Sequence, residues 1–118
     1  MMKKCYIAGK IGDTHESVYK AKFEQAKQEV RDMGFEPISP VDLPHAHDKT
    51  WTSYMKEDLT IMLQCDCVYA LRDWRHSPGA KIEIRTATDV GIAVYHQSHL
   101  TEKEPYEESL IELRKYQH

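Results

Sequence analysis

Apolar residues recur at helical spacing in three stretches of the chain. In the first, from about Glu16 to Met33, Gly34 follows the last apolar position and predicts the end of a helix. In the second, which begins at Trp51, Thr50 precedes the helix as its cap. The third is entered through a Ser-Pro-Gly turn. The three apolar stripes consist of Tyr19, Phe23, Ala26, Val30 and Met33; of Trp51, Met55, Leu59 and Met62; and of Ala80, Ile84, Ala87, Val90 and Gly91.

Short apolar runs alternate with these helices and predict four strands, at 4–8, 35–39, 67–71 and 92–95. Pro37 places the second strand near an edge of the sheet, because proline has no N–H to donate to a neighbouring strand. A further helix is expected at about 104–116, with Pro105 in its first turn. Strands that alternate with helices favour a parallel sheet covered on both faces. We therefore expect one domain spanning 1–118, a small doubly wound, flavodoxin- or Rossmann-like α/β fold with strand order 2-1-3-4.

The composition is that of an ordinary globular protein, with 41% hydrophobic and 30% charged residues in a chain of 118. The net charge of −3 and the scattered lysines and arginines exclude a nucleic-acid polymer as the expected partner. No apolar stretch approaches the ~20 residues that a membrane span needs, so no membrane partner is expected. The opening MMKK leads directly into a strand rather than a signal sequence, and the expected location is cytoplasmic.

Cysteine and histidine are the residues that could hold a metal. The run 65–67 has C-x-C spacing, unlike the C-x-x-C of zinc and redox motifs, so the three cysteines are predicted to be free, buried thiols. The pairs His45/His47 and His96/His99 lie in loop-like segments without an accompanying carboxylate or thiolate signature. We predict no metal and no other cofactor. A metal-dependent hydrolase built on the histidine pairs is the weakest alternative.

In a doubly wound sheet, ligands bind beyond the carboxyl ends of the strands where the strand order reverses, here between the first and third strands. Loops 9–12 and 73–79 flank this place. Glycines let a ligand approach the backbone closely, and the free amides of a helix N-terminus favour an anion. The residues from these loops that we expect to contact a substrate are Gly9, Lys10, Ile11, Gly12, Trp74, Ser77 and Gly79.

Two carboxylates occupy unexpected positions beside this crevice. Glu83 falls within the apolar stripe of the third helix, although an uncompensated buried carboxylate is costly. Asp58 borders the stripe of the preceding helix. Together they suggest paired carboxylate chemistry, with one nucleophile and one proton donor or orienting group. The alternatives are that Glu83 compensates the helix dipole, that Asp58 is a rim residue and that Tyr6 belongs to the core.

Motifs along most of the chain resemble the nucleoside 2-deoxyribosyltransferase-like superfamily. They are YIAGKIG at 6–12, Trp51 followed by EDL at 57–59, and CDCVYALRDWRHSPGAKIE at 65–83 with Ala87 and Gly91. The similarity extends over roughly residues 5–95 and is greatest to a branch of small bacterial and phage domains.

The resemblance implies that Glu83 is the nucleophile that attacks C1′ of the deoxyribose, that Tyr6 orients it and that Asp58 handles the base or its proton. In relatives that hydrolyse 2′-deoxynucleoside 5′-monophosphates, the residues matching Ser77 and Gly79 hold the phosphate. The expected function is cleavage or transfer of the N-glycosidic bond of a nucleoside or nucleotide, through a covalent glycosyl-enzyme on Glu83 and without a cofactor. A non-catalytic nucleotide-binding or sensing domain using the same crevice is the alternative.

The first loop departs from the pattern of these relatives. The phosphate-hydrolysing relatives carry an arginine at the position of Gly12, and the small-domain relatives usually carry proline in place of Lys10. A point-charge lysine does not reproduce the bidentate contact of an arginine, so the sequence does not decide between a 5′-phosphate and a free 5′-hydroxyl on the substrate. In several relatives a neighbouring subunit completes the pocket. We therefore expect a homodimer or higher homo-oligomer, with the apolar face of the last helix as the contact.

Overall fold

The computed structural model describes residues 2–45 and 47–98, which form a three-layer α/β fold. Its centre is a four-stranded, all-parallel sheet of order β2-β1-β3-β4. The strands are β1 Lys4–Ala8, β2 Glu36–Ile38, β3 Cys67–Ala70 and β4 Ala93–His96. The predicted fold class and strand order are confirmed, and β2 with its Pro37 is an edge strand as expected.

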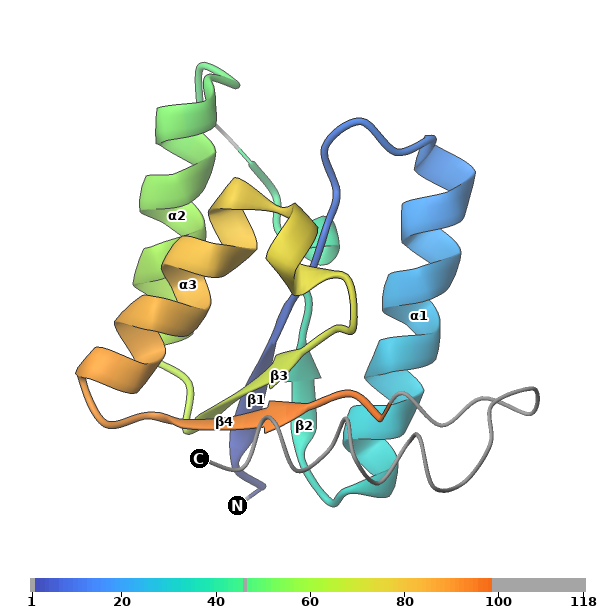
Figure 1. Ribbon diagram of the computed structural model, residues 1–118, viewed down its shortest axis with the longest axis vertical. Helices are drawn as coiled ribbons and strands as arrows, with labels where there is room; N and C mark the ends of the chain where they lie inside the picture. Colours follow the sequence, from blue (N-terminus) through green and yellow to red (C-terminus); the bar gives the residue numbers. More distant parts are fainter. Residues whose placement is uncertain (1, 46, 99–118) are drawn as a thin grey trace.

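Three helices cover the sheet, α1 Glu16–Asp32, α2 Trp51–Leu63 and α3 Pro78–Asp89. Two short 3₁₀ helices, η1 Pro40–Asp42 and η2 Trp74–His76, lie in the connections. Figure 1 shows α2 and α3 on one face of the sheet and α1 on the other. Within 2–45 and 47–98, no helix is both long enough and apolar enough to cross a membrane. The helix predicted at about 104–116, and with it the expected dimer contact, lies outside the described residues.

Local sequence signals mark the ends of two of these helices, at the positions that the sequence analysis predicts. The side chain of Thr50 accepts a hydrogen bond from the backbone N–H of Ser53 at 3.1 Å and caps α2. Gly34 follows α1 with a φ of +91°, a conformation that L side chains rarely adopt. Such caps satisfy backbone groups that the helix itself leaves free. The helix boundaries are therefore set locally.

The two central strands are buried on both faces, which separates the core into two clusters. Tyr6 and Ala8 of β1 face α2 and α3, whereas Cys5 and Ile7 face α1, and all four are fully buried. The α2–α3 cluster also contains Met62, Cys65, Val68, Ala70, Ala80, Ile84 and Ala87. The α1 cluster also contains Phe23, Ala26, Val30, Cys67, Tyr69 and Leu71. All three cysteines are free and buried, as predicted.

Candidate active site

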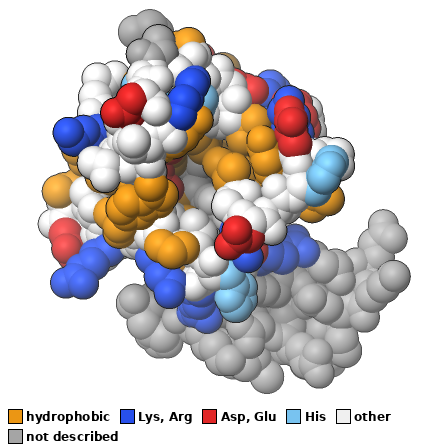
Figure 2. All heavy atoms as spheres, turned by 90° about the horizontal axis from the view of Figure 1, so that it is seen from above, with side chains coloured by type: hydrophobic (Ala, Val, Ile, Leu, Met, Phe, Trp, Pro, Cys, Tyr) orange, Lys and Arg blue, Asp and Glu red, His pale blue; other side chains and the backbone are white. Residues whose placement is uncertain are grey.

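A cavity of about 550 Å³ opens at the carboxyl ends of β1 and β3. Figure 2 looks onto this end of the molecule and shows a central hollow with hydrophobic side chains around it. Nine of the ten predicted site residues line the cavity. They are Tyr6, Gly9, Lys10, Ile11 and Gly12 from β1 and its loop, and Asp58, Ser77, Gly79 and Glu83 from α2, α3 and the turn before α3.

Trp74 is not among the lining residues. It lies in η2, where its ring is partly buried against the α2–α3 cluster. The ring centroid is 6.0 Å from that of His96, and the guanidinium carbon of Arg75 lies 5.4 Å from the Trp74 centroid. The 3₁₀ turn directs this large apolar ring to the core rather than to the cavity. The expected substrate contact by Trp74 is therefore not supported by the geometry.

Tyr6 and Glu83 meet at the bottom of the cavity. The Tyr6 hydroxyl donates a hydrogen bond of 2.5 Å to Oε2 of Glu83, across 77 positions of sequence. Tyr6 is fully buried and Glu83 is 5% exposed, between the buried Ala80, Ile84 and Ala87 on the inner face of α3. The carboxylate that the sequence placed in an apolar stripe has a specific partner.

Burial dominates the electrostatics of this pair. It raises the pKa of Glu83 from 4.5 to about 8, although the Tyr6 hydrogen bond lowers it, and the charge of Asp58 adds a further increase. Burial, followed by the charge of Glu83, raises the pKa of Tyr6 well above 10. The phenol therefore keeps its proton and remains a donor to the carboxylate. Strongly perturbed groups in a cleft are typical of functional sites.

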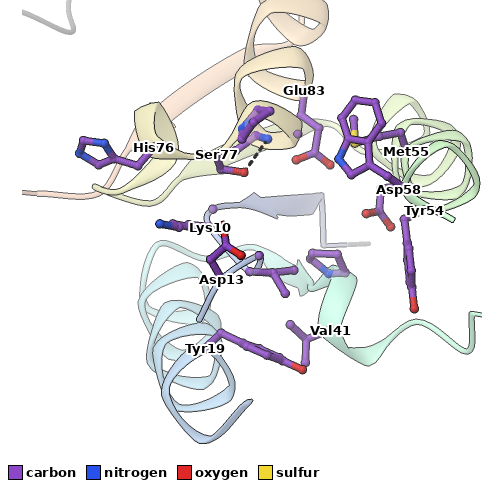
Figure 3. Close-up of a pocket in the computed structure, with 18 of the residues that line it drawn as sticks. Lys10, Asp13, Tyr19, Val41, Tyr54, Met55, Asp58, His76, Ser77 and Glu83 are labelled. Carbon is purple, nitrogen blue, oxygen red and sulfur yellow. Dashed lines mark hydrogen bonds between the residues drawn. The ribbon is translucent and has the colours of Figure 1, made fainter. Parts of the chain in front are cut away.

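Asp58 extends from α2 into the same cavity, and Figure 3 shows its carboxylate and that of Glu83 both pointing into the space between the helices. Its Oδ1 is buried without a hydrogen-bond partner. Burial is the main reason that the pKa of Asp58 rises from 3.8 to about 6. A carboxyl group with such a pKa exchanges protons readily near neutral pH. Two carboxyl groups in one cavity can supply a nucleophile and a proton donor.

The loop after β1 is held by contacts that the sequence analysis missed. Asp73 accepts a hydrogen bond from the backbone N–H of Lys10 at 3.1 Å, and the Lys22 ammonium bridges the Lys10 carbonyl at 2.6 Å and the Asp73 carboxylate at 2.5 Å. Gly9 is required by close approach, because an added Cβ would stand 2.5 Å from Cδ1 of Leu71. Neither contact has a local sequence signal, since the partners come from distant segments.

An aromatic and apolar wall lines the rest of the cavity, and the sequence analysis did not include its residues in the site. Trp51, Tyr54 and Met55 come from α2, whereas Tyr19 and Val41 come from α1 and η1. Figure 3 shows Tyr19 and Val41 across the cavity from Ser77 and Glu83. Trp51 lines the cavity and is 57% exposed, so its ring is accessible to a ligand. Its position as the first residue of α2 was the sequence signal that could have identified Trp51 as a site residue.

Ser77 caps α3, and its side chain accepts a hydrogen bond from the Ala80 N–H at 3.1 Å (Figure 3). Beside the cavity, the structure corrects the expectation that the first histidine pair has no accompanying carboxylate. Glu57 of α2 lies beside His45 and His47, and the three residues offer ligand atoms within 4.8 Å of one another. The second pair is not tested, because His99 lies outside the described residues.

Comparison with known proteins identifies the family of the chain and its structural neighbours. Residues 3–96 match the model of a family described as a domain of unknown function, DUF4406. No curated protein matches the chain. A 2-deoxyribosyltransferase from the psychrotolerant bacterium Bacillus psychrosaccharolyticus has a similar structure, with a TM-score of 0.62 and 22% identity over 90% of this chain and 81% of that one.

Two further solved structures share the architecture. A conserved protein from Enterococcus faecalis V583 is similar with a TM-score of 0.63 and 21% identity, over 99% of this chain and 77% of that one. A 2-desoxiribosyltransferase from Leishmania mexicana is similar with a TM-score of 0.58 and 14% identity, over 98% and 99% of the two chains. At these identities the likeness concerns the fold. The chain is therefore a member of the DUF4406 family and has a nucleoside 2-deoxyribosyltransferase-like fold.

Proposed function

We propose that this protein cleaves or transfers the N-glycosidic bond of a nucleoside or nucleoside 5′-monophosphate, through a covalent glycosyl-enzyme on Glu83. The observation that carries the proposal is the buried hydrogen bond from Tyr6 to Glu83 at the bottom of a cavity that Asp58 shares. A purely structural carboxylate would not need burial in a ligand-sized cavity next to a second unpartnered carboxylate. The deoxyribosyltransferases among the structural neighbours support the same class of reaction.

The first step is displacement at the anomeric carbon. An Oε atom of Glu83 attacks C1′, the C1′–N bond breaks, and the bonding electron pair leaves with the base. Asp58 donates its proton to the departing nitrogen. Tyr6 remains protonated and holds the second carboxylate oxygen of Glu83, which orients the attacking one. The product is a glycosyl ester on Glu83 and a free base.

The second step regenerates the enzyme. Water or a second base attacks C1′, the ester bond to Glu83 breaks, and the Asp58 carboxylate takes a proton from the attacking group. Splitting one displacement into two in this way is the established advantage of a covalent intermediate. Each step leaves Glu83 and Asp58 ready for the next, so atoms and charges balance over the cycle without a cofactor.

One proton shared by two carboxyl groups explains how a carboxyl group with a raised pKa can be a nucleophile. Between about pH 6 and pH 8 the pair holds one proton, and that proton resides mainly on Glu83. Transfer of this proton to Asp58 creates the nucleophile and the proton donor together. The total charge of the site does not change, so the transfer avoids placing a second negative charge in the cavity.

The rest of the cavity fits the other parts of such a substrate. The wall of Trp51, Tyr54, Val41 and Tyr19 offers faces on which a planar base can stack. At the opposite side, the N-terminus of α3 at Ser77 offers free amide groups to an anionic 5′ substituent. The cavity volume of about 550 Å³ is in the range that holds one ligand of nucleotide size.

The direct test incubates the protein with a panel of nucleosides and 5′-monophosphates and separates free base by chromatography. We expect base release from at least one member of the panel and, in acid-quenched samples, a protein mass increased by one sugar unit. Peptide mapping should place that increase on Glu83. Binding of nucleotides without base release or an adduct would instead favour a non-catalytic binding or sensing domain.

A further inference from the structure

Three polar atoms meet without hydrogen-bond partners where the segment after η1 approaches α2. They are Nδ1 of His45, Nε2 of His47 and Oε1 of Glu57, and each is buried. The same three residues offer ligand atoms that all lie within 4.8 Å of one another. Both imidazole nitrogens form ion-pair contacts with the Glu57 oxygen, but neither contact has the geometry of a hydrogen bond. Because buried polar atoms are almost always hydrogen-bonded, an ion between the three atoms would satisfy all of them.

We propose that His45, His47 and Glu57 bind one divalent transition-metal ion of the zinc class. Imidazole nitrogens suit zinc, copper and nickel, whereas magnesium and calcium prefer sites made only of oxygen atoms. Two histidines and one glutamate form a recognised ligand set for zinc, with a fourth position left for water. The cluster therefore selects for zinc and its neighbours rather than for hard cations.

The spacing of the ligands needs little adjustment. A tetrahedral zinc ion with bonds of about 2.1 Å separates its ligand atoms by roughly 3.4 Å. Nε2 of His47 lies 3.9 Å from Oε1 of Glu57, and Nδ1 of His45 is already in contact with the same oxygen. The Tyr54 ring stands edge-on to both imidazoles, with centroids 4.9 and 4.5 Å away, and restricts their orientation. Small rotations of the three side chains would place their ligand atoms around one ion.

Hydrogen bonds on the far side of the rings determine which nitrogen is available. Nε2 of His45 is 2.8 Å from the carbonyl oxygen of Pro40, which can only accept, so Nε2 carries a proton and Nδ1, which faces Glu57, is the nitrogen that would bind the ion in place of a proton. Nδ1 of His47 accepts from the backbone N–H of Lys49 at 3.0 Å. Binding through Nε2 therefore moves the His47 proton to Nδ1 and releases that amide, which lies on the exposed surface where water replaces the bond.

An ion at this position would tie the segment before α2 to the helix itself. His45 and Tyr54 line the cavity, and Glu57 directly precedes Asp58. The ion would thus stabilise one wall of the cavity. No step of the proposed glycosyl chemistry passes through it, so metal binding and catalysis can succeed or fail independently.

The experiment uses the full chain without a histidine tag, freed of metal with a chelator and titrated with zinc against a colorimetric competitor. We expect one ion per chain and an unfolding midpoint that rises by about 10 °C at a hundredfold excess of free zinc over its Kd. His47→Ala and Glu57→Gln should each weaken binding by more than about 100-fold. His76→Ala, which removes a histidine outside the cluster, should leave binding unchanged.

Glu57→Gln keeps the shape of the side chain, so circular dichroism of this variant separates loss of a ligand from loss of the fold. Cobalt titration separates the proposed site from the cysteines, because thiolate ligation produces an intense near-ultraviolet charge-transfer band and histidine–carboxylate ligation does not. Zinc binding that is absent, that survives both ligand variants, or that shows the thiolate band would overturn the proposal. A one-to-one ion lost in both variants but not in His76→Ala supports it.

Discussion

Replacing Glu83 with glutamine tests the central residue through both stability and activity. Folding raises the pKa of Glu83 from 4.5 to about 8, so the native state binds more protons than the unfolded state between these values. A carboxyl group with a raised pKa makes the native protein lose stability as the pH rises through that window. Each pKa unit corresponds to about 1.4 kcal/mol, and the loss accumulated at pH 7 is therefore about 3 kcal/mol.

Glutamine cannot ionise and escapes this penalty. Its amide oxygen can still accept the Tyr6 hydrogen bond, whereas its buried amide N–H₂ adds a pH-independent cost of about 1–3 kcal/mol. Near pH 5 we expect Glu83→Gln to be equal to the wild type or less stable. The difference should then shift in favour of the variant by about 1 kcal/mol per pH unit up to about pH 8. Base release and the sugar adduct should be abolished at every pH.

Urea unfolding followed by circular dichroism at pH 5, 6, 7 and 8 measures the stability difference. Glu36→Gln makes the same chemical change at an exposed glutamate of β2 and is the matched control. It should follow the wild type at all four pH values and retain activity. Parallel stability curves for Glu83→Gln and the wild type would contradict the assigned burial. A fully active Glu83→Gln would remove the case for a covalent intermediate on this residue.

Three further outcomes follow from the same geometry. The pH profile of kcat/KM should be bell-shaped with flanks near pH 6 and pH 8, because the carboxylate pair holds one proton between these values. A profile that is flat from pH 6 to pH 8 would exclude the shared proton. Tyr6→Phe removes the hydrogen bond that lowers the pKa of Glu83, so the alkaline flank should move upward and the maximal rate should fall about tenfold per pKa unit. An unshifted flank would show that Tyr6 is only a core residue. Gly9→Ala should lower the free energy of unfolding in urea titrations by about 1–3 kcal/mol, because the added Cβ would lie 2.5 Å from the Leu71 side chain. Gly12→Ala should leave it unchanged, because a Cβ at Gly12 would have nothing within 4 Å, and equal effects of the two variants would contradict the close approach at Gly9.

The sequence alone determined the order of the elements and their arrangement in the sheet. Hydrophobic periodicity is a local property, so it located the three helices and four strands of the described residues to within a few positions. Capping is equally local, and Thr50 and Gly34 mark helix ends in the structure as in the sequence. The rule that ligands bind where a parallel sheet changes direction then placed the crevice beside loops 9–12 and 73–79.

The partner of Glu83 was decided by tertiary structure. An apolar stripe shows that a carboxylate is out of place but not which group, 77 positions away, will meet it. The resemblance to a known superfamily supplied Tyr6 as a candidate, and the parallel pairing of β1 with β3 brings β1 to the centre of the sheet under α3. The raised pKa of Glu83 arises mainly from that burial.

The aromatic wall, the orientation of Trp74 and the meeting of Glu57 with His45 and His47 were also decided by tertiary structure. In each case the side chains come from different elements, and their contacts depend on how far and at what angle one element lies from the next. Periodicity along a single helix or strand predicts which side chains share a face, but not how far that face lies from the neighbouring element. The sequence therefore determined where the crevice forms, whereas the packing of helices on the sheet decided which side chains meet inside it.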